Sequence, residues 1–205
     1  SIYLSEQSGE IISGKTASFI FPIMITNIGT HNVVYTDIEN TDNYDHIYQS
    51  DLCGWVGQLG YNKDSIYGAN VFTAEGNETL KAASFYATGK DSQYELYVVR
   101  QFEDETSLEK MIPVASGKLG NAGYYTVDFN QGIEVDAGER YAVVLYIITP
   151  GSVHPMAIEY AADEATENVD LDDGESYISA NGSKWVSVDT VEKSNLCIKA
   201  FSDNR

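Results

Sequence analysis

Short stretches rich in Tyr, Val, Ile and Phe follow one another along most of the chain after residue 65, as is typical of β-strands. In YTVDF (125–129) the apolar residues alternate with Thr126 and Asp128, so they form one face of a strand and should look inward. The predicted strands cover residues 69–74, 80–88, 94–102, 123–129, 140–149, 157–161, 176–180, 184–188 and 196–201.

One apolar run, YAVVLYII (141–148), does not alternate and predicts a strand in the middle of a sheet, covered on both faces. ANGS (180–183) places Asn-Gly between two predicted strands, a pair that favours a tight hairpin because both residues tolerate positive φ. The best candidate for a helix is DETSLEKMI (104–112), with one or two turns. Many short strands separated by turns predict an all-β fold, a β-sandwich or jelly roll.

The first forty residues differ from the rest. SFIFPIMITNIG (18–29) is apolar but contains Pro22, which cannot donate to a strand ladder and suits an edge strand or a bulge. TDIENTDNYD (36–45) is polar and turn-forming, like a linker. The sequence therefore predicts that residues 1–40 are an N-terminal segment or the remnant of a preceding domain, and that residues 41–205 form the main domain.

The chain has 205 residues, with 12 Lys and Arg against 31 Asp and Glu, and a formal net charge of −19. This charge opposes approach to nucleic acid phosphates and to anionic lipid, so nucleic acid is excluded as a partner. The longest apolar run is far shorter than the roughly 20 residues of a spanning helix, which predicts no membrane insertion. The chain begins at Ser1 and shows no targeting region, so we expect that either a signal was removed or the chain begins inside a longer protein.

Two cysteines, Cys53 and Cys197, are too few for a disulfide framework or a four-thiolate zinc site. One bridge between them would close a long loop and stabilise the fold by about 4–5 kcal/mol, but we favour two free, packed thiols. The three histidines, His31, His46 and His154, stand in separate irregular segments without the spacing of a zinc site.

Several motifs resemble, in one order, the lectin-like domain that follows the catalytic domain in some bacterial and archaeal papain-like cysteine peptidases. The motifs are NYDHIYQSD (43–51), GW (54–55), YGANVFTA (67–74), ETLKAASFYAT (78–88), GYYTVDF (123–129), SYISANGSKW (176–185) and NLCIKAF (195–201). Together they span about residues 40–202, and their shared order is more specific than any one motif.

The resemblance implies a β-sandwich outside the cell or on the cell wall, attached to a peptidase, with a role in attachment to cell-surface glycan. It also implies calcium in some members, without assigning ligand positions in this chain. Where the family reads Tyr-Asp-Pro, an apolar residue and Gly-Trp, this chain reads Ser50, Asp51, Leu52, Cys53, Gly54 and Trp55. Cys53 thus stands at an apolar position, which favours a packed side chain.

A papain-like nucleophile would need the signature Cys-Gly-[Ser/Ala]-Cys-[Trp/Tyr], and this signature is absent around Cys53. Acidic residues gather in DEATENVDLDDGE (163–175), which predicts a solvated loop. Within it, Gly174 at the turn position of an EF-hand would put Val169 and Leu171 at ligand places, so that register fails. Calcium remains a candidate cofactor with no assigned ligands.

Sugar binding joins an aromatic ring, which covers the apolar face of a pyranose, to polar groups that fix its hydroxyls. Aromatic residues in or beside glycine-rich turns are the candidates for the ring, namely Trp55, Tyr61, Tyr67 and Trp185. Asn70 is the polar candidate, and Asn62 and Asp64 lie nearby in the sequence. The alternative is that these rings pack in the interior, as Trp usually does in sandwiches.

These observations favour a non-catalytic carbohydrate-binding or cell-surface-binding module of a secreted papain-like cysteine peptidase, located outside the cell or on the wall. The expected partner is cell-surface glycan. A second hypothesis is a structural module that docks on the parent peptidase domain and stabilises it without binding sugar. A third is an independent hydrolase with a carboxylate pair, for which abundant acidic residues alone are not evidence.

Overall fold

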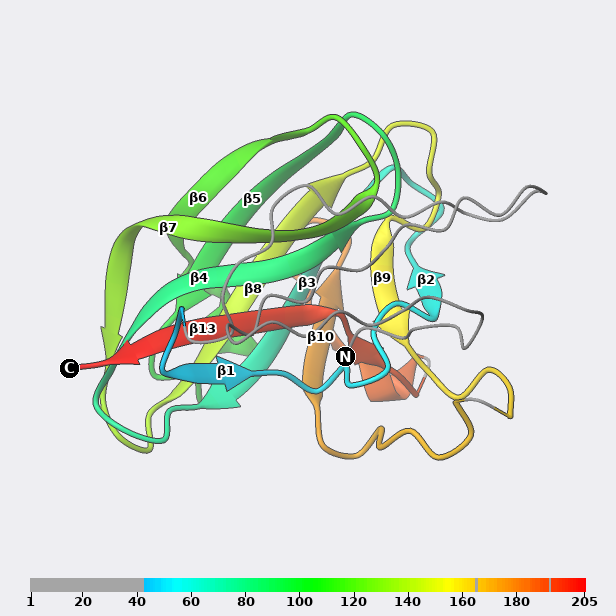
Figure 1. The fold of residues 1–205 in the computed structure, drawn as a ribbon. Coiled ribbons are helices and arrows are strands. Elements are labelled where there is room, and N and C mark those ends of the chain that lie inside the picture. Colours follow the sequence, from blue (N-terminus) through cyan, green and yellow to red (C-terminus); the bar gives the residue numbers. More distant parts are fainter. Residues whose placement is uncertain (1–42, 165, 192) are drawn as a thin grey trace, which may run out of the picture.

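Strand-forming segments pair in antiparallel register throughout the computed structural model, which describes residues 43–164, 166–191 and 193–205 (Figure 1). The apolar segment 18–29, His31 and the boundary predicted near residue 40 lie outside the described residues. No helix in the described part of the chain is long and apolar enough to cross a membrane.

Two sheets form the layers of a sandwich. The four-stranded sheet has the order β1 (His46–Tyr48), β13 (Ile198–Asn204), β4 (Glu78–Ala87), β7 (Gly123–Val135). The six-stranded sheet has the order β11 (Val186–Ser187), β10 (Glu175–Ser179), β3 (Ser65–Thr73), β8 (Arg140–Ile148), β5 (Ser92–Val99), β6 (Ile112–Leu119). The predicted all-β sandwich is confirmed.

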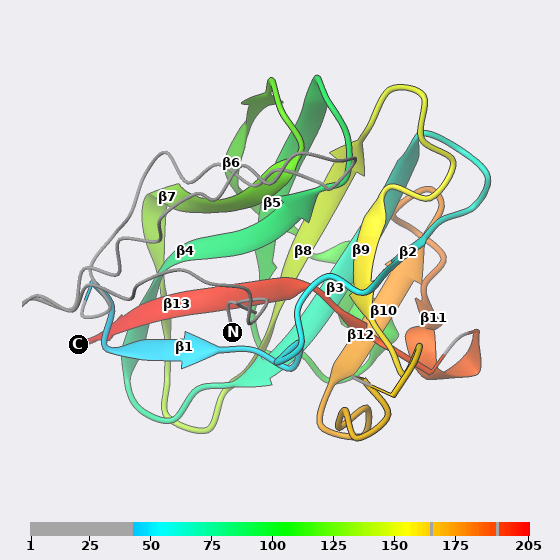
Figure 2. The ribbon, with the colours of Figure 1, turned by 45° about the vertical axis from the view of Figure 1, so that its right-hand side comes forward.

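A small third sheet lies at one side of the sandwich (Figure 2). Its order is β12 (Asn195–Leu196), β9 (Met156–Glu159), β2 (Gly57–Leu59). Met156, Ile158 and Leu196 from this sheet reach the main core, so it closes the interior at that side. Two single turns of 3-10 helix complete the described elements, η1 (Glu105–Glu109) and η2 (Val188–Thr190).

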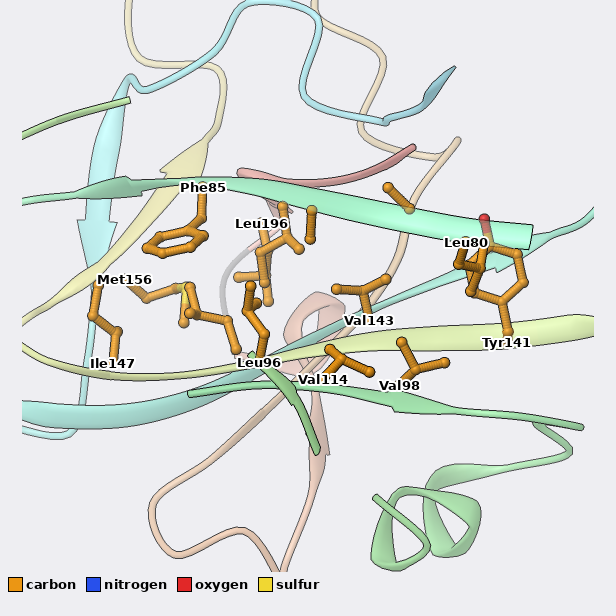
Figure 3. Packing of buried hydrophobic residues seen from close by; sticks show 14 of the residues in the cluster. Leu80, Phe85, Leu96, Val98, Val114, Tyr141, Val143, Ile147, Met156 and Leu196 are labelled. Carbon is orange, nitrogen blue, oxygen red and sulfur yellow. The ribbon is translucent and has the colours of Figure 1, made fainter. Parts of the chain in front are cut away.

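The main core lies between the two large sheets (Figure 3). Phe85 and Leu80 of β4 face Leu96 of β5 and Tyr141 and Val143 of β8, and all five are buried. On β7, Val127 and Phe129 turn toward this core while Thr126 and Asp128 are exposed, as the alternation predicts. Burial of these side chains is the main source of stability, at about 25 cal/mol for each Å² of apolar surface removed from water.

β8 is covered on both faces, as its continuous apolar run predicts. It pairs with β3 on one side and β5 on the other. Its odd-numbered residues enter the main core, whereas Ala142 and Val144 belong to a second apolar cluster on the outer face of the six-stranded sheet. Leu108 of η1 and Phe102, from the segment that follows β5, cover this cluster. The helix predicted at 104–112 is this single turn.

Some strands differ from those that the sequence predicts. β6 was not predicted, because Pro113 and Gly117 interrupt its pattern; it lies at the edge of its sheet, where proline is tolerated. The predicted strand at 196–201 divides into β12 and β13 around Cys197. The structure contains no disulfide between the two cysteines; Cys197 is buried and Cys53 is partly buried.

Candidate functional site

Two of the five candidate ligand-binding residues, Tyr67 and Trp185, meet on the outer face of the six-stranded sheet. Tyr67 belongs to β3, and Trp185 immediately precedes β11. Their rings meet edge to face with centroids 6.2 Å apart. On its other side Tyr67 stacks on Tyr146 of β8, with centroids 4.2 Å apart. We call Trp185, Tyr67 and Tyr146 the aromatic row.

The pairing of β8, β5 and β6 places polar side chains in line with the aromatic row. Tyr146 lies opposite Glu95 of β5, and Glu95 lies opposite Ser116 of β6. Residues directly opposite one another share a face of the sheet, so the carboxylate and the hydroxyl stand beside the rings. Glu95 also accepts a hydrogen bond from the hydroxyl of Tyr97, and both Glu95 and Ser116 are exposed.

A pocket of about 260 Å³ opens on the β5 side of Tyr146. We call it the sheet pocket, and its lining residues are Gln93, Tyr94, Glu95, Ser116, Gly117, Lys118, Tyr146 and Ile148. Amide, carboxylate, hydroxyl and ammonium groups thus surround one tyrosine ring. This is the combination that sugar recognition requires, a ring for the apolar face of a pyranose and polar groups for its hydroxyls.

The sheet pocket is open because the outer face of the sheet is only half covered. Leu108 and Phe102 lie over Ala142 and Val144, at one end of the strands. Tyr146 stands at the border of this covered half, and the next outward residue of β8, Ile148, lines the pocket. Partial burial has an electrostatic effect, because desolvation, together with the nearby Tyr146 and Glu95, raises the pKa of Tyr67. At neutral pH the hydroxyl of Tyr67 is protonated even without this shift, and it can donate hydrogen bonds.

The hairpin predicted from Asn-Gly places one glycine against the aromatic row. Gly182 has a φ of +75°, and a Cβ built there would lie 3.1 Å from the ring of Tyr67. Ser179 fixes the turn, since its hydroxyl accepts hydrogen bonds from the backbone N–H groups of Asn181 and Gly182. A residue without a side chain is thus required both by the backbone and by the ring.

We expect Gly182→Ala to lower the free energy of unfolding by about 2 kcal/mol, because the left-handed backbone disfavours alanine by roughly 1–2 kcal/mol and Tyr67 is displaced as well. Gly138→Ala is the matched control, since its φ is +77° and no described atom lies within 4 Å of the added Cβ. Denaturant titration compares the two. Equal losses would contradict a packing role for Gly182.

Asn70 lies in the interior, with 1% of its surface exposed. Its amide nitrogen donates to the carbonyl oxygens of Leu196 and Ile198, both at 2.9 Å, and its amide oxygen accepts from the Ser176 hydroxyl. These contacts use both amide hydrogens. Asn70 therefore ties β3 to β12 and β13, and we do not include it in the proposal below.

Trp55 and Tyr61 lie away from the aromatic row. Trp55 follows β1 in a loop, is 37% exposed and contacts Tyr86 of β4 with centroids 5.7 Å apart. Tyr86 contacts Tyr124 of β7 at 5.0 Å, so these rings form a strip on the outer face of the opposite sheet, which we call the Trp55 strip. Tyr61 is half-buried and packs against the main core.

A second polar site surrounds Asn195 of β12. Its amide nitrogen lies within 2.9–3.2 Å of four oxygens: the carbonyls of Ser50 and Asp170 and the carboxylates of Glu159 and Asp173. We call these five residues the oxygen cluster. An amide nitrogen has only two hydrogens, so two of the four oxygens cannot receive one. Four oxygens from three separate segments therefore converge on one amide group, and the Ser50 carbonyl and the Glu159 carboxylate each have a further donor in the backbone N–H groups of Leu52 and Cys53.

Glu159 is the buried carboxylate of the oxygen cluster, with 0% of its surface exposed. One carboxylate oxygen accepts from the backbone N–H of Cys53 and the other from Asn195. Among the described residues no lysine or arginine pairs with it. Burial raises the pKa of nearby Asp173, as do the charges of Asp170 and Asp172, although the bond to Asn195 opposes the shift. Buried carboxylates are normally paired or coordinate a metal.

The oxygen cluster contains donor types that calcium takes, namely carboxylates and carbonyls. The amide nitrogen of Asn195 stands between these oxygens, so a cation there would require the amide to rotate and present its oxygen. In the described part of the chain no group of three or more His, Cys, Asp and Glu side chains is placed to hold a metal ion, so the two carbonyls and the rotated amide would be essential. Gly174 is required here, since a Cβ would lie 2.4 Å from the amide oxygen of Asn195.

The acidic loop is exposed over most of its length, as predicted, and only Leu171 of its described residues is buried. Asp172 and Asp173 are both exposed; Asp172 pairs with Lys193 at 2.7 Å, and Asp173 reaches Asn195. Sequence reasoning noticed Gly174 and Asp173 but compared them with an EF-hand. Glu159 carried no signal, because its segment predicts only a strand.

A buried ion pair lies behind the Trp55 loop. Lys199 of β13 donates to the carboxylate of Asp51 at 2.9 Å and to the amide oxygen of Gln49 at 2.7 Å. Burial raises the pKa of Asp51, although Lys199 acts in the opposite direction. Burial also raises the pKa of the Cys197 thiol well above its ordinary value, so this thiol is protonated at neutral pH and suits packing.

Comparison with known proteins relates this architecture to one domain type. The family model described as a lectin-like domain matches residues 47–202. The structure of the clostridial cysteine protease Cwp84 after propeptide cleavage is 24% identical, with a TM-score of 0.69, and the match covers 82% of this chain and 42% of that one. No curated protein matches the sequence.

A second structure contains the cysteine protease and lectin-like domains of Cwp84, a surface layer associated protein of Clostridium difficile. It is 20% identical, with a TM-score of 0.63, and the match covers 82% of this chain and 38% of that one. The chain thus spans less than half the length of both structures. At these identities the likeness shows the fold alone.

Proposed function

The chain belongs to the lectin-like domain family, and from this we propose that it is a non-catalytic module that attaches a secreted cysteine peptidase to cell-surface carbohydrate. The proposed setting outside the cell follows Cwp84, which is a surface layer associated protein with cysteine protease and lectin-like domains. The acidic surface, with a net charge of −19, is consistent with a partner that is neither nucleic acid nor anionic lipid.

The observation that carries the proposal is the ring of Tyr146 beside Gln93, Glu95, Ser116 and Lys118 in the sheet pocket. Its volume is slightly below the roughly 300–1,000 Å³ typical of drug-sized ligands, which suits one or two sugar rings. The pocket lies on regular strands, so its groups are held in place without a ligand. Such preorganisation reduces the entropy lost on binding.

Binding of the domain to cell-wall polysaccharide tests the proposal. We expect Tyr146→Ala to weaken binding about thirtyfold, the equivalent of about 2 kcal/mol for a central aromatic contact. Tyr124→Ala is the matched control, because it removes a 43% exposed tyrosine from the opposite sheet. Isothermal titration calorimetry provides the affinities. If both variants bound as the unchanged protein does, the sheet pocket would not be the glycan site.

A second candidate function rests on the Trp55 strip. Trp55 and Tyr124 are large apolar side chains exposed by 37% and 43%, and Tyr86 joins them across the four-stranded sheet. Exposed aromatic patches mark protein contacts, so this strip suits docking on a peptidase domain. In that case Tyr124→Ala would weaken co-elution with the parent peptidase domain, while Tyr146→Ala would not.

We also propose that the oxygen cluster holds calcium. Glu159 and Asp173 would supply carboxylates and Ser50 and Asp170 carbonyls, all of which now face the amide nitrogen of Asn195. Asn195 would contribute its amide oxygen only after rotation of the amide, because that oxygen lies on the side of Gly174. The cation would neutralise the buried carboxylate and connect the loop that follows β1 with the acidic loop and β12. Its role is structural, since the site lies on side chains distinct from those of the sheet pocket.

A further inference from the structure

The aromatic row and the polar residues Glu95 and Ser116 that continue it form a line of outward side chains. This line is longer than the sheet pocket. Three strand spacings of about 4.8 Å separate Tyr67 from Ser116, and Trp185 adds another 6.2 Å beyond Tyr67. The side chains from Trp185 to Ser116 therefore extend for about 20 Å in a direction across the strands. A single sugar ring in the sheet pocket would contact only one end of this line.

A second line of outward side chains runs parallel to the first. Ser65 lies opposite Ile148, Ile148 lies opposite Gln93, and Gln93 lies opposite Lys118. These residues are two positions farther along each strand and share the same face. Their side chains are half-buried or exposed, so they form a floor beside the rings. The floor continues from β6 to β3, past the limits of the sheet pocket.

Tyr146 and Trp185 each keep part of their surface exposed, although Trp185 also packs against the second apolar cluster. Tyr146 is stacked by Tyr67 on one side and lines the sheet pocket on the other. Trp185 stands at the far end, edge to face with Tyr67, and remains partly exposed. Each ring can cover the apolar face of one sugar. Tyr67 lies 4.2 Å from Tyr146 and 6.2 Å from Trp185, so the two outer rings are close enough to contact different sugars of one short chain.

The charged side chains along this line favour some glycans over others. Glu95 stands in the middle of the line and is exposed, so it would repel a phosphate or carboxylate group placed over it. Lys118 lies at the β6 end of the floor. A net charge of −19 adds to the repulsion of anionic polymers at a distance.

We infer that the ligand is an uncharged glycan chain longer than a disaccharide, lying across the strands from the sheet pocket to Trp185. This inference rests on the proposed function and specifies its ligand. The pocket end binds one sugar and Trp185 binds another farther along the same chain. Affinity should therefore rise with chain length until the chain reaches Trp185.

Calorimetry with glucose and N-acetylglucosamine mono-, di-, tetra- and hexasaccharides tests the inference on the full chain. We expect about a tenfold gain in affinity between di- and tetrasaccharide, and no further gain to the hexasaccharide. Trp185→Ala should remove this gain while leaving the affinity for the disaccharide unchanged. Trp185→Phe, which keeps a ring, should restore part of it. Val186→Ala, in the adjacent exposed position of β11, is the matched control.

The outcomes separate the two proposals. Equal affinity for di- and tetrasaccharide, with no effect of Trp185→Ala, would overturn the extended ligand and leave the sheet pocket intact. Tighter binding of a uronic acid oligosaccharide than of the neutral one would overturn the inference that the ligand is uncharged. Failure of every oligosaccharide and of cell-wall polysaccharide to bind would overturn both the inference and the proposed function.

Discussion

Lys199→Met should lower the free energy of unfolding by about 3–5 kcal/mol, one of the largest effects expected of any single change in this domain. The Asp51 carboxylate is 0% exposed, and the ammonium of Lys199 lies 2.9 Å from it. Methionine fills a similar volume but leaves the carboxylate without its cation. Taking a charge out of water without compensation is more costly than losing a surface ion pair.

Urea denaturation of three further variants isolates this effect. Lys81→Met removes an exposed pair with Asp203 at 3.8 Å and should change stability by less than about 1 kcal/mol. Asp51→Asn combined with Lys199→Met should be less destabilised than the sum of the two single variants, because no unpaired charge remains. A loss of under about 1 kcal/mol for Lys199→Met alone would show that water or another group compensates Asp51.

Local patterning predicts the strands of this fold well, since burial imposes a two-residue period on strands such as β7 and a continuous apolar run on β8. The turn between β10 and β11 is equally local at Gly182, whose φ of +75° restricts the choice of residue, although Asn181 does not adopt the positive φ that the Asn-Gly pair predicts. Edge strands such as β6 are less predictable. Their pattern is interrupted by residues that only an edge tolerates, so the sequence gives a weaker signal.

The candidate site is less predictable because it depends on register. Tyr67 and Trp185 stand beside glycine turns and are recognisable, but Tyr146 lies inside a continuous apolar run that suggests only burial. Glu95 and Ser116 become its neighbours through the pairing of β8, β5 and β6. Asn70 shows the converse: its place beside an aromatic segment suggested ligand binding, yet its neighbours are backbone carbonyls.

Calcium should raise the midpoint of thermal unfolding by roughly 5–10 °C. A cation present at about 100 times its dissociation constant stabilises the folded state by about 2.7 kcal/mol, and each kcal/mol shifts the midpoint of a domain of this size by about 2–4 °C. The physical reason is Glu159, whose buried carboxylate has only two hydrogen-bond donors in the described structure. Chelation should reverse the shift.

Glu159→Gln should give opposite results with and without calcium. In chelator, the variant should be as stable as the unchanged protein or more stable, because it no longer buries an uncompensated charge. In calcium it should fall below the unchanged protein, because a ligand is lost. Asp172→Asn is the matched control from the acidic loop, since Asp172 is exposed and pairs with Lys193 instead. If calcium and chelator gave the same midpoint for the unchanged protein, the oxygen cluster would hold no cation.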